Sequence, residues 1–108
     1  MNYSIIPTHR FEKEIKRLIK KFPSLKKEYA SLIAKLKINP ALGIPLGNNC
    51  YKIRLAIASK SKGKSGGARV ITYLLTDNIV VYLLTIYDKS ELDSISDKEL
   101  KTIISELD

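Results

Sequence analysis

The spacing of apolar residues changes from a helical period to a strand period about halfway along the chain. Early on, apolar residues recur every three or four positions over 11–22 and 25–36, which predicts two amphipathic helices. Thr8 and Ser24 precede them as N-caps, and Pro23 separates them. Two helices joined by so short a turn predict a hairpin that buries one side against a sheet.

The sheet has to come from segments with a period of two. Strands are expected over residues 3–6, 50–58, 69–75 and 79–87. Alternation in the second of these segments predicts that Ile53 faces the core while Lys52 and Arg54 face the other way. The last segment is almost continuously apolar, which is typical of a central, buried strand.

Ser96 and Glu99 form a capping-box pattern that opens a third helix. The expected order is β-α-α-β-β-β-α, an α+β fold with the helical hairpin on one face of a mainly antiparallel sheet. The other face is expected to stay open for function. No repeat or linker divides the sequence, so residues 1–108 are expected to form one domain.

The distribution of charged residues indicates which kind of molecule the protein binds. The chain carries 19 Lys and Arg against 11 Asp and Glu, a net charge of +8. No acidic residue occurs between Glu28 and Asp77. Because like charges this dense repel one another without an anion among them, the segment favours phosphate binding and hence nucleic acid.

The numbers of cysteine and histidine residues argue against disulfide and metal chemistry. Cys50 is the only cysteine and His9 the only histidine, so neither an internal disulfide nor a metal cluster is expected. Cys50 is interpreted as a small strand residue and His9 as a surface or packing residue. No apolar run approaches ~20 residues and the N-terminus lacks a signal-peptide pattern, so a soluble cytoplasmic protein without a cofactor is expected.

A lysine-rich loop lies between two of the expected strands. Its Gly-Lys-Ser triplet is not a phosphate-binding P-loop, because the first required glycine would fall at Ala58 and a strand follows. Lys60, Lys62 and Lys64 are instead expected to bind RNA phosphates, with a merely solvated loop as the alternative.

Basic residues on three strands are expected to meet on the open face: Lys52, Arg54, Arg69 and Lys89. Tyr87 and Thr85 are expected to share that face. Such a group without a carboxylate suits attack of an RNA 2′-oxygen on the adjacent phosphate. Arginines would stabilise the developing charge. Tyr87 or Lys89 would transfer protons if neighbouring cations lowered their pKa values, with a packed or base-stacking aromatic as the alternative for Tyr87.

Three sequence runs resemble the RelE/ParE superfamily of bacterial toxins, closest to its HigB-like branch: residues 52–54, residues 59–69 with Lys-Gly-Lys-Ser-Gly-Gly-Ala-Arg, and residues 82–91 with Leu-Leu-Thr-Ile-Tyr-Asp-Lys. The similarity covers roughly residues 39–100. It implies a toxin that enters the ribosomal A site and cuts messenger RNA, held inactive by an antitoxin encoded beside it, expected here to be a helix-turn-helix protein. It also implies basic site residues at Lys52, Arg54 and Arg69, and Tyr87 or Lys89 near the end of the sheet.

Two alternatives stay open at this point. The same superfamily includes ParE-like toxins, which inhibit DNA gyrase without cutting RNA, and a fold alone does not choose between the activities. A relative that binds nucleic acid but has lost catalysis is the other. The acidic region after Asp88 is expected to pack on the sheet edge or hold the antitoxin.

Overall fold

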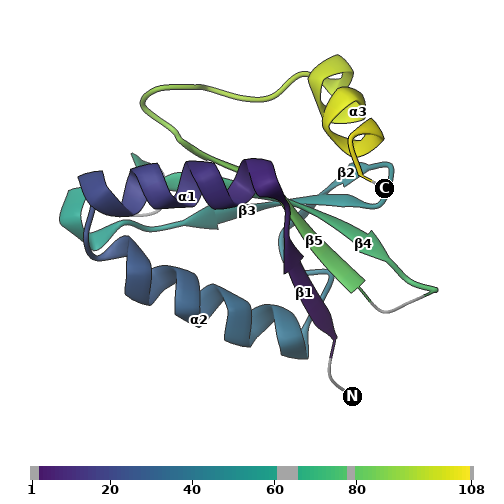
Figure 1. Ribbon diagram of the computed structural model, residues 1–108, viewed down its shortest axis with the longest axis horizontal. Helices are drawn as coiled ribbons and strands as arrows, with labels where there is room; N and C mark the ends of the chain where they lie inside the picture. Colours follow the sequence, from purple (N-terminus) through teal and green to yellow (C-terminus); the bar gives the residue numbers. More distant parts are fainter. Residues whose placement is uncertain (1–2, 61–65, 78–79, 108) are drawn as a thin grey trace.

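Figure 1 shows the computed structural model, which describes residues 3–60, 66–77 and 80–107. Its elements in chain order are β1 (Ser4–Pro7), α1 (His9–Lys21), α2 (Leu25–Ile38), β2 (Ile44–Gly47), β3 (Cys50–Leu55), the 3-10 turn η1 (Ala58–Lys60), β4 (Ala68–Leu75), β5 (Val80–Asp88) and α3 (Asp97–Ser105). The three described helices have 13, 14 and 9 residues, and none could cross a bilayer.

The five strands form one sheet in the order β1-β5-β4-β3-β2. β1 runs parallel to β5, and every other pair is antiparallel. The α+β class and the helical hairpin on one face are confirmed. The short edge strand β2 was missed, because Pro45 and Gly47 are poor strand residues. The sequence does carry a hairpin signal at this place, the pair Asn48-Asn49. Both residues take positive φ in the turn from β2 to β3, which asparagine tolerates.

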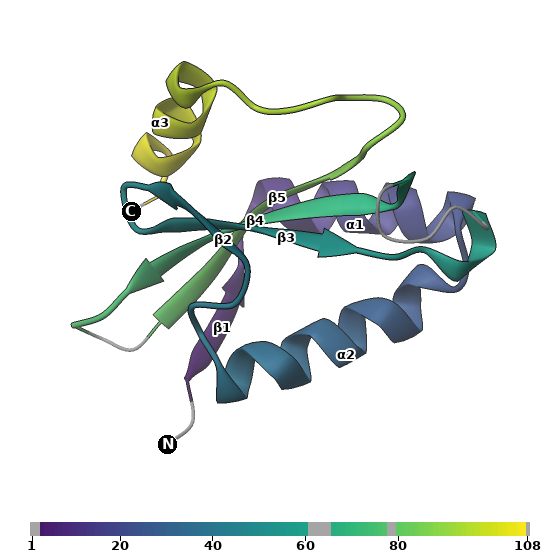
Figure 2. The same ribbon diagram turned by 180° about the vertical axis from the view of Figure 1, so that it is seen from behind.

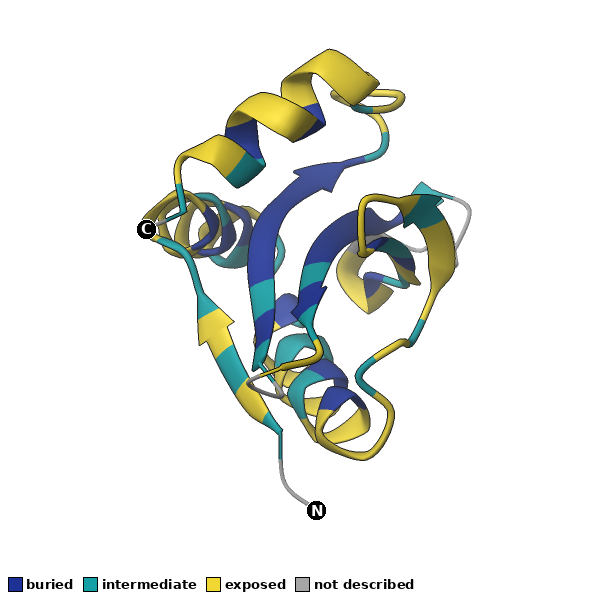
Figure 3. Cartoon of the chain, turned by 90° about the vertical axis from the view of Figure 1, so that its right-hand side faces the viewer, coloured by how far each residue is buried: buried dark blue, intermediate teal, exposed yellow. Residues whose placement is uncertain are grey.

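The helical hairpin covers one face of the sheet because its apolar stripes are buried there. Phe11, Leu18 and Leu25 are fully buried in a core with the inward residues of β4 and β5. The Thr8 hydroxyl accepts a hydrogen bond from the Phe11 N–H at 3.1 Å, which confirms the expected N-cap. Figure 3 shows β4 and β5 buried along most of their length, whereas the edge strand β1 carries exposed positions.

The second face of the sheet is only partly open. Leu100 and Ile103 of α3 pack against Cys50, Ile71 and Leu84 in a second, smaller core. The expectation of a fully open face was therefore wrong over this area. The reason is that α3 has an apolar stripe of its own, and the hairpin already occupies the first face.

A β-bulge interrupts the pairing of β4 and β5 between Ile71 and Thr72. It breaks the alternation of β5 at Leu84, before Thr85. Thr85 lies opposite Ile71 and Tyr87 opposite Arg69, so these two residues of β5 share a face, as expected. The Thr85 hydroxyl donates to Glu14 of α1 at 2.6 Å, and the Ile86 N–H donates to the same carboxylate oxygen at 3.2 Å. Glu14 thus satisfies the backbone at the bulge and ties α1 to β5.

Replacing Glu14 by alanine is expected to lower the free energy of unfolding by about 2 kcal/mol, because a buried hydroxyl and a buried N–H lose their acceptor. The melting temperature should fall by roughly 5 to 15 °C in a calorimetric scan. Glu12→Ala, an exposed glutamate of the same helix, is the control. Equal melting temperatures for the two variants would contradict this role.

Candidate functional site

Three residues from three adjacent strands lie directly opposite one another. Arg54 of β3 pairs with Arg69 of β4, and Arg69 pairs with Tyr87 of β5. Directly opposed residues share a face of the sheet. Since Tyr87 belongs to the core under α3, this row lies on the face that α3 partly covers. Lys52 shares that face, because it is opposite Ile71 of the same core.

The two arginines in the row have different environments. Arg54 is exposed, whereas Arg69 is only 5% exposed and donates from Nη1 to the Ala68 carbonyl oxygen at 3.1 Å. Like charges placed directly opposite each other on neighbouring strands destabilise a sheet. An anion bound between two such guanidinium groups would offset that repulsion. This geometry provides one fixed and one adjustable donor group.

Tyr87 supplies the only phenol of the row. Its hydroxyl is buried and has no hydrogen-bond partner within the described part of the chain. Burial raises the pKa of Tyr87 above its usual value, and the charge of Arg69 offsets this only partly. The expectation that neighbouring cations lower this pKa was therefore wrong. A neutral phenol with an unsatisfied hydroxyl is suited to donate a proton rather than to accept one.

Lys89 follows β5 and is engaged by a carboxylate. Its Nζ donates to the Asp93 carbonyl oxygen at 2.9 Å and also forms an ion pair with the Asp93 carboxylate. The hydrogen bond and charge of Lys89 lower the pKa of Asp93, and the charges of Lys52 and Arg69 lower it further. Asp93 therefore lies near Lys52 of β3 and Arg69 of β4 as well as Lys89. The expectation of a site without a carboxylate was wrong.

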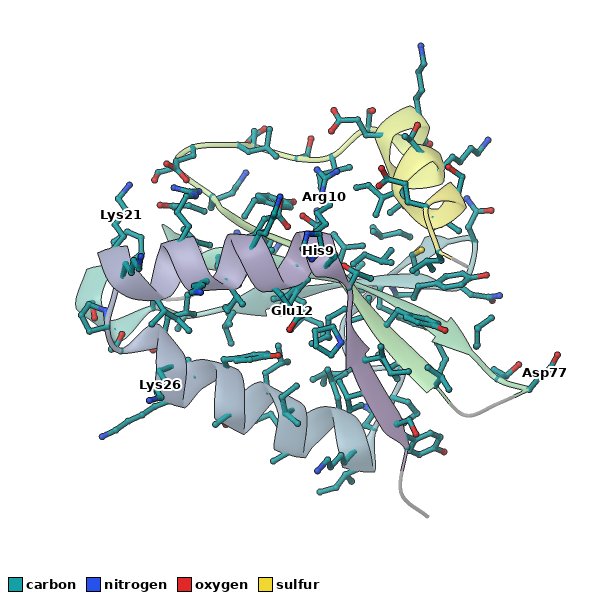
Figure 4. The ribbon with its side chains drawn as sticks, in the orientation of Figure 1. His9, Arg10, Glu12, Lys21, Lys26 and Asp77 are labelled. Carbon is teal, nitrogen blue, oxygen red and sulfur yellow. The ribbon has the colours of Figure 1, made fainter. Side chains whose placement is uncertain are left out.

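Replacing Asp93 by asparagine is expected to tighten binding of a short single-stranded RNA by about two- to fivefold at low salt, because an exposed competing anion is removed. Fluorescence anisotropy with a labelled RNA checks this. Asp77→Asn makes the same change of charge at the far tip of the β4–β5 hairpin (Figure 4) and should leave the affinity unchanged. Identical affinities for parent and Asp93→Asn would show that Asp93 does not compete with phosphate.

The lysine-rich loop begins at a fixed point. Ser24 and Ser59 exchange two hydrogen bonds, each from a backbone N–H to the other's hydroxyl, and the Ala58 N–H donates to Glu28 of α2 at 2.8 Å. These contacts attach η1 to the helical hairpin, at the end where Figure 4 shows Lys21 and Lys26. The Lys60 side chain, Lys62 and Lys64 lie outside the described residues, so their RNA-binding role stays a prediction.

The two single residues behave as structural groups. Cys50 is buried beneath α3, and burial raises the pKa of its thiol to about 11, which keeps it protonated and unreactive. His9 is exposed at the start of α1 (Figure 4), as expected of a surface residue.

No protein-family model matches this chain. Solved structures do. A doubly substituted variant of the Escherichia coli toxin RelE in the free state superimposes with a TM-score of 0.61 at 18% identity, over 98% of this chain and 94% of that one. The chain has the RelE fold. The fold expected from the sequence resemblance is thereby confirmed, whereas the HigB-like branch stays a prediction.

Two further RelE structures contain antitoxin. The same RelE variant bound to a peptide of the antitoxin RelB gives a TM-score of 0.62 at 15% identity, covering 99% of both chains. The intact E. coli RelBE complex gives 0.60 at 19% identity, over 80% of this chain and 95% of that one. At these identities the likeness to RelE concerns the fold, so activity has to be argued from this chain's own residues.

Proposed function

We propose that this protein is the toxin of a type II toxin-antitoxin pair and an endoribonuclease that cuts messenger RNA on the ribosome, without a metal ion or cofactor, in the bacterial cytoplasm. The observation that supports it most is the row Arg54, Arg69 and Tyr87 across three strands, with a buried tyrosine hydroxyl that has no partner within the described part of the chain. The RelE fold adds to this support.

In the proposed reaction the scissile phosphate binds between the two arginines. As the RNA 2′-oxygen attacks, negative charge grows on the non-bridging oxygens, where the forked donors of Arg54 and the fixed Arg69 stabilise it. The 2′-hydroxyl proton passes to solvent water as the O2′–P bond forms. Tyr87, which its raised pKa keeps protonated, gives its proton to the 5′-oxygen as the P–O5′ bond breaks, and water then reprotonates the phenolate. The products are a 2′,3′-cyclic phosphate and a free 5′-hydroxyl.

Lysines complete the proposed site. Lys52, Lys60, Lys62 and Lys64 would bind phosphates of the message and the ribosome. Lys89 was a second candidate for proton transfer, and its ammonium is held by Asp93. It would reach the substrate only after an incoming phosphate displaces that carboxylate, so we assign it to charge stabilisation in the bound state.

The alternative of a ParE-like gyrase inhibitor has less support. A protein that blocks gyrase has no use for a guanidinium pair opposed across two strands beside a buried phenol, and these groups cost stability where they are. The partner proposed for the toxin is an antitoxin encoded next to it, a helix-turn-helix protein.

Cleavage of a defined message by the purified chain, with and without translating ribosomes, tests the proposal. We expect cuts at the codon in the A site, a 2′,3′-cyclic phosphate on the upstream fragment, and no cut where that nucleotide carries a 2′-deoxy sugar. Loss of plasmid supercoiling with the message intact would instead identify a gyrase inhibitor. Salt-dependent RNA binding without any product would identify an inactive relative.

A further inference from the structure

A groove of about 440 Å³ runs between α2 and the outer edge of β3. One wall is a single face of α2, formed by Glu28, Ser31, Leu32 and Lys35, and the other is the stretch from Lys52 to Ala56. Leu42, Gly43 and Ile44 also line it. Figure 2 shows the molecule from this side, with α2 running alongside β3 and β2 in front.

The outer edge of β3 is only half paired. β2 pairs with β3 as far as Ile44 opposite Lys52, and β3 continues to Leu55. Within the described residues no strand pairs with this continuation on its outer side. An unpaired strand edge beside a groove is a template for adding another strand.

Two glycines show which peptide groups point into the groove. A Cβ on Gly43 would lie 2.6 Å from the Lys52 carbonyl oxygen, so that carbonyl points outward, toward β2. A Cβ on Gly67 would lie 2.1 Å from the Leu55 carbonyl oxygen, so that carbonyl points inward, toward β4. Because successive residues of a strand alternate, Arg54 directs its N–H and C=O outward, into the groove.

The two sides of an added strand would meet different surroundings. Side chains directed toward α2 would contact apolar groups, since Leu32, Ile53 and Leu42, which line the groove, all belong to or pack against the hairpin-side core. Side chains directed to the other side would lie next to Lys52 and Arg54, whose side chains are on the opposite face. The one acid that lines the groove, Glu28, is already bonded to Ser24 and Ala58.

We propose that this groove binds an extended segment of an acidic protein, added as a strand along Arg54, with apolar residues toward α2 alternating with carboxylates toward Lys52 and Arg54. Charge complementarity selects this occupant, and a nucleic acid would leave the apolar wall unused. The inference rests on the proposed function in one respect, namely that the partner is the antitoxin. Such a strand would block the toxin by placing carboxylates where substrate phosphate binds.

Amide exchange measured by NMR on the full chain tests the groove. The probe is a synthetic peptide of about eight residues that alternates valine and glutamate. It should slow exchange of the Arg54 amide by about tenfold or more and leave the inward amides of Ile53 and Leu55 unchanged. A peptide of the same composition with all valines first and all glutamates last should have no effect. If neither peptide, or both alike, protects Arg54, the proposal is overturned.

Two tryptophan variants of α2 test whether the peptide binds in the groove. Ser31→Trp fills the groove from α2 and should abolish protection. Ala30→Trp changes the next residue of the helix, which is exposed and does not line the groove, and should not abolish it. Neither residue belongs to the catalytic row, so message cleavage should equal that of the parent. Protection of Arg54 by RNA instead of peptide, or protection that survives Ser31→Trp in a folded variant, would overturn the proposal. Absence of cleavage in the parent would count against the proposed function alone.

Discussion

The Arg69→Ala variant should cut messenger RNA about 100- to 1000-fold more slowly than the parent, because it loses fixed donors for the developing phosphate charge. Arg69 is the central member of the row and the one whose guanidinium is held in place by the Ala68 carbonyl. The measurement is single-turnover cleavage of a defined message at saturating enzyme. Growth arrest on expression in bacteria should be lost with it.

Folding has to be separated from chemistry in this experiment, since a buried arginine also packs. Arg69→Lys keeps the charge but not the forked donors and should recover only a small part of the rate. Arg10→Ala removes an exposed arginine on α1 and should cut like the parent. A folded Arg69→Ala protein that cleaves at the parental rate would refute the assignment.

The Tyr87→Phe variant should cleave about 100-fold or more slowly, because it keeps the ring and loses the proton that protonates the 5′-oxygen. RNA affinity should change little. Since the pKa of Tyr87 is raised, the phenol stays protonated through the neutral range, and cleavage by the parent should not decline between about pH 7 and pH 9.5. A pH–rate profile corrected for spontaneous hydrolysis measures this.

Tyr82→Phe makes the same change on the same strand, beside Tyr73 at the other end of the sheet, and serves as its control. An unchanged rate in Tyr87→Phe would leave this residue a packed aromatic. A parental rate that falls with a midpoint well below pH 9.5 would also exclude the neutral phenol as the proton donor.

The local pattern of apolar and polar residues was sufficient to predict the helical hairpin and β3. The apolar periods of the helical hairpin and the alternation of β3 depend only on neighbouring residues, so both were predicted, as was the face shared by Lys52 and Arg54. The roles of the site residues stay predictions, although the structure brings Arg54, Arg69 and Tyr87 into one row.

Features that depend on contacts across the sheet were not predictable. The bulge between β4 and β5 was missed because it adds a residue to one strand, and no local pattern signals where that happens. Asp93 was missed because it approaches the site from the segment between β5 and α3, six positions after Tyr87. The bulge depends on pairing between strands, whereas Asp93 reaches the site through Lys89, four positions before it, and the path of the chain after β5 sets that contact.

The parallel pairing of β1 with β5 has a consequence for how the protein folds during its synthesis. Ser4 lies opposite Val80, and Thr8 donates to the Leu83 carbonyl across 75 positions of sequence. A nascent chain that ends before β5 therefore lacks both the partner of its first strand and the strand that carries Tyr87. The row of Arg54, Arg69 and Tyr87 therefore cannot form until the chain has been made at least as far as Tyr87 and β5 has paired with β4.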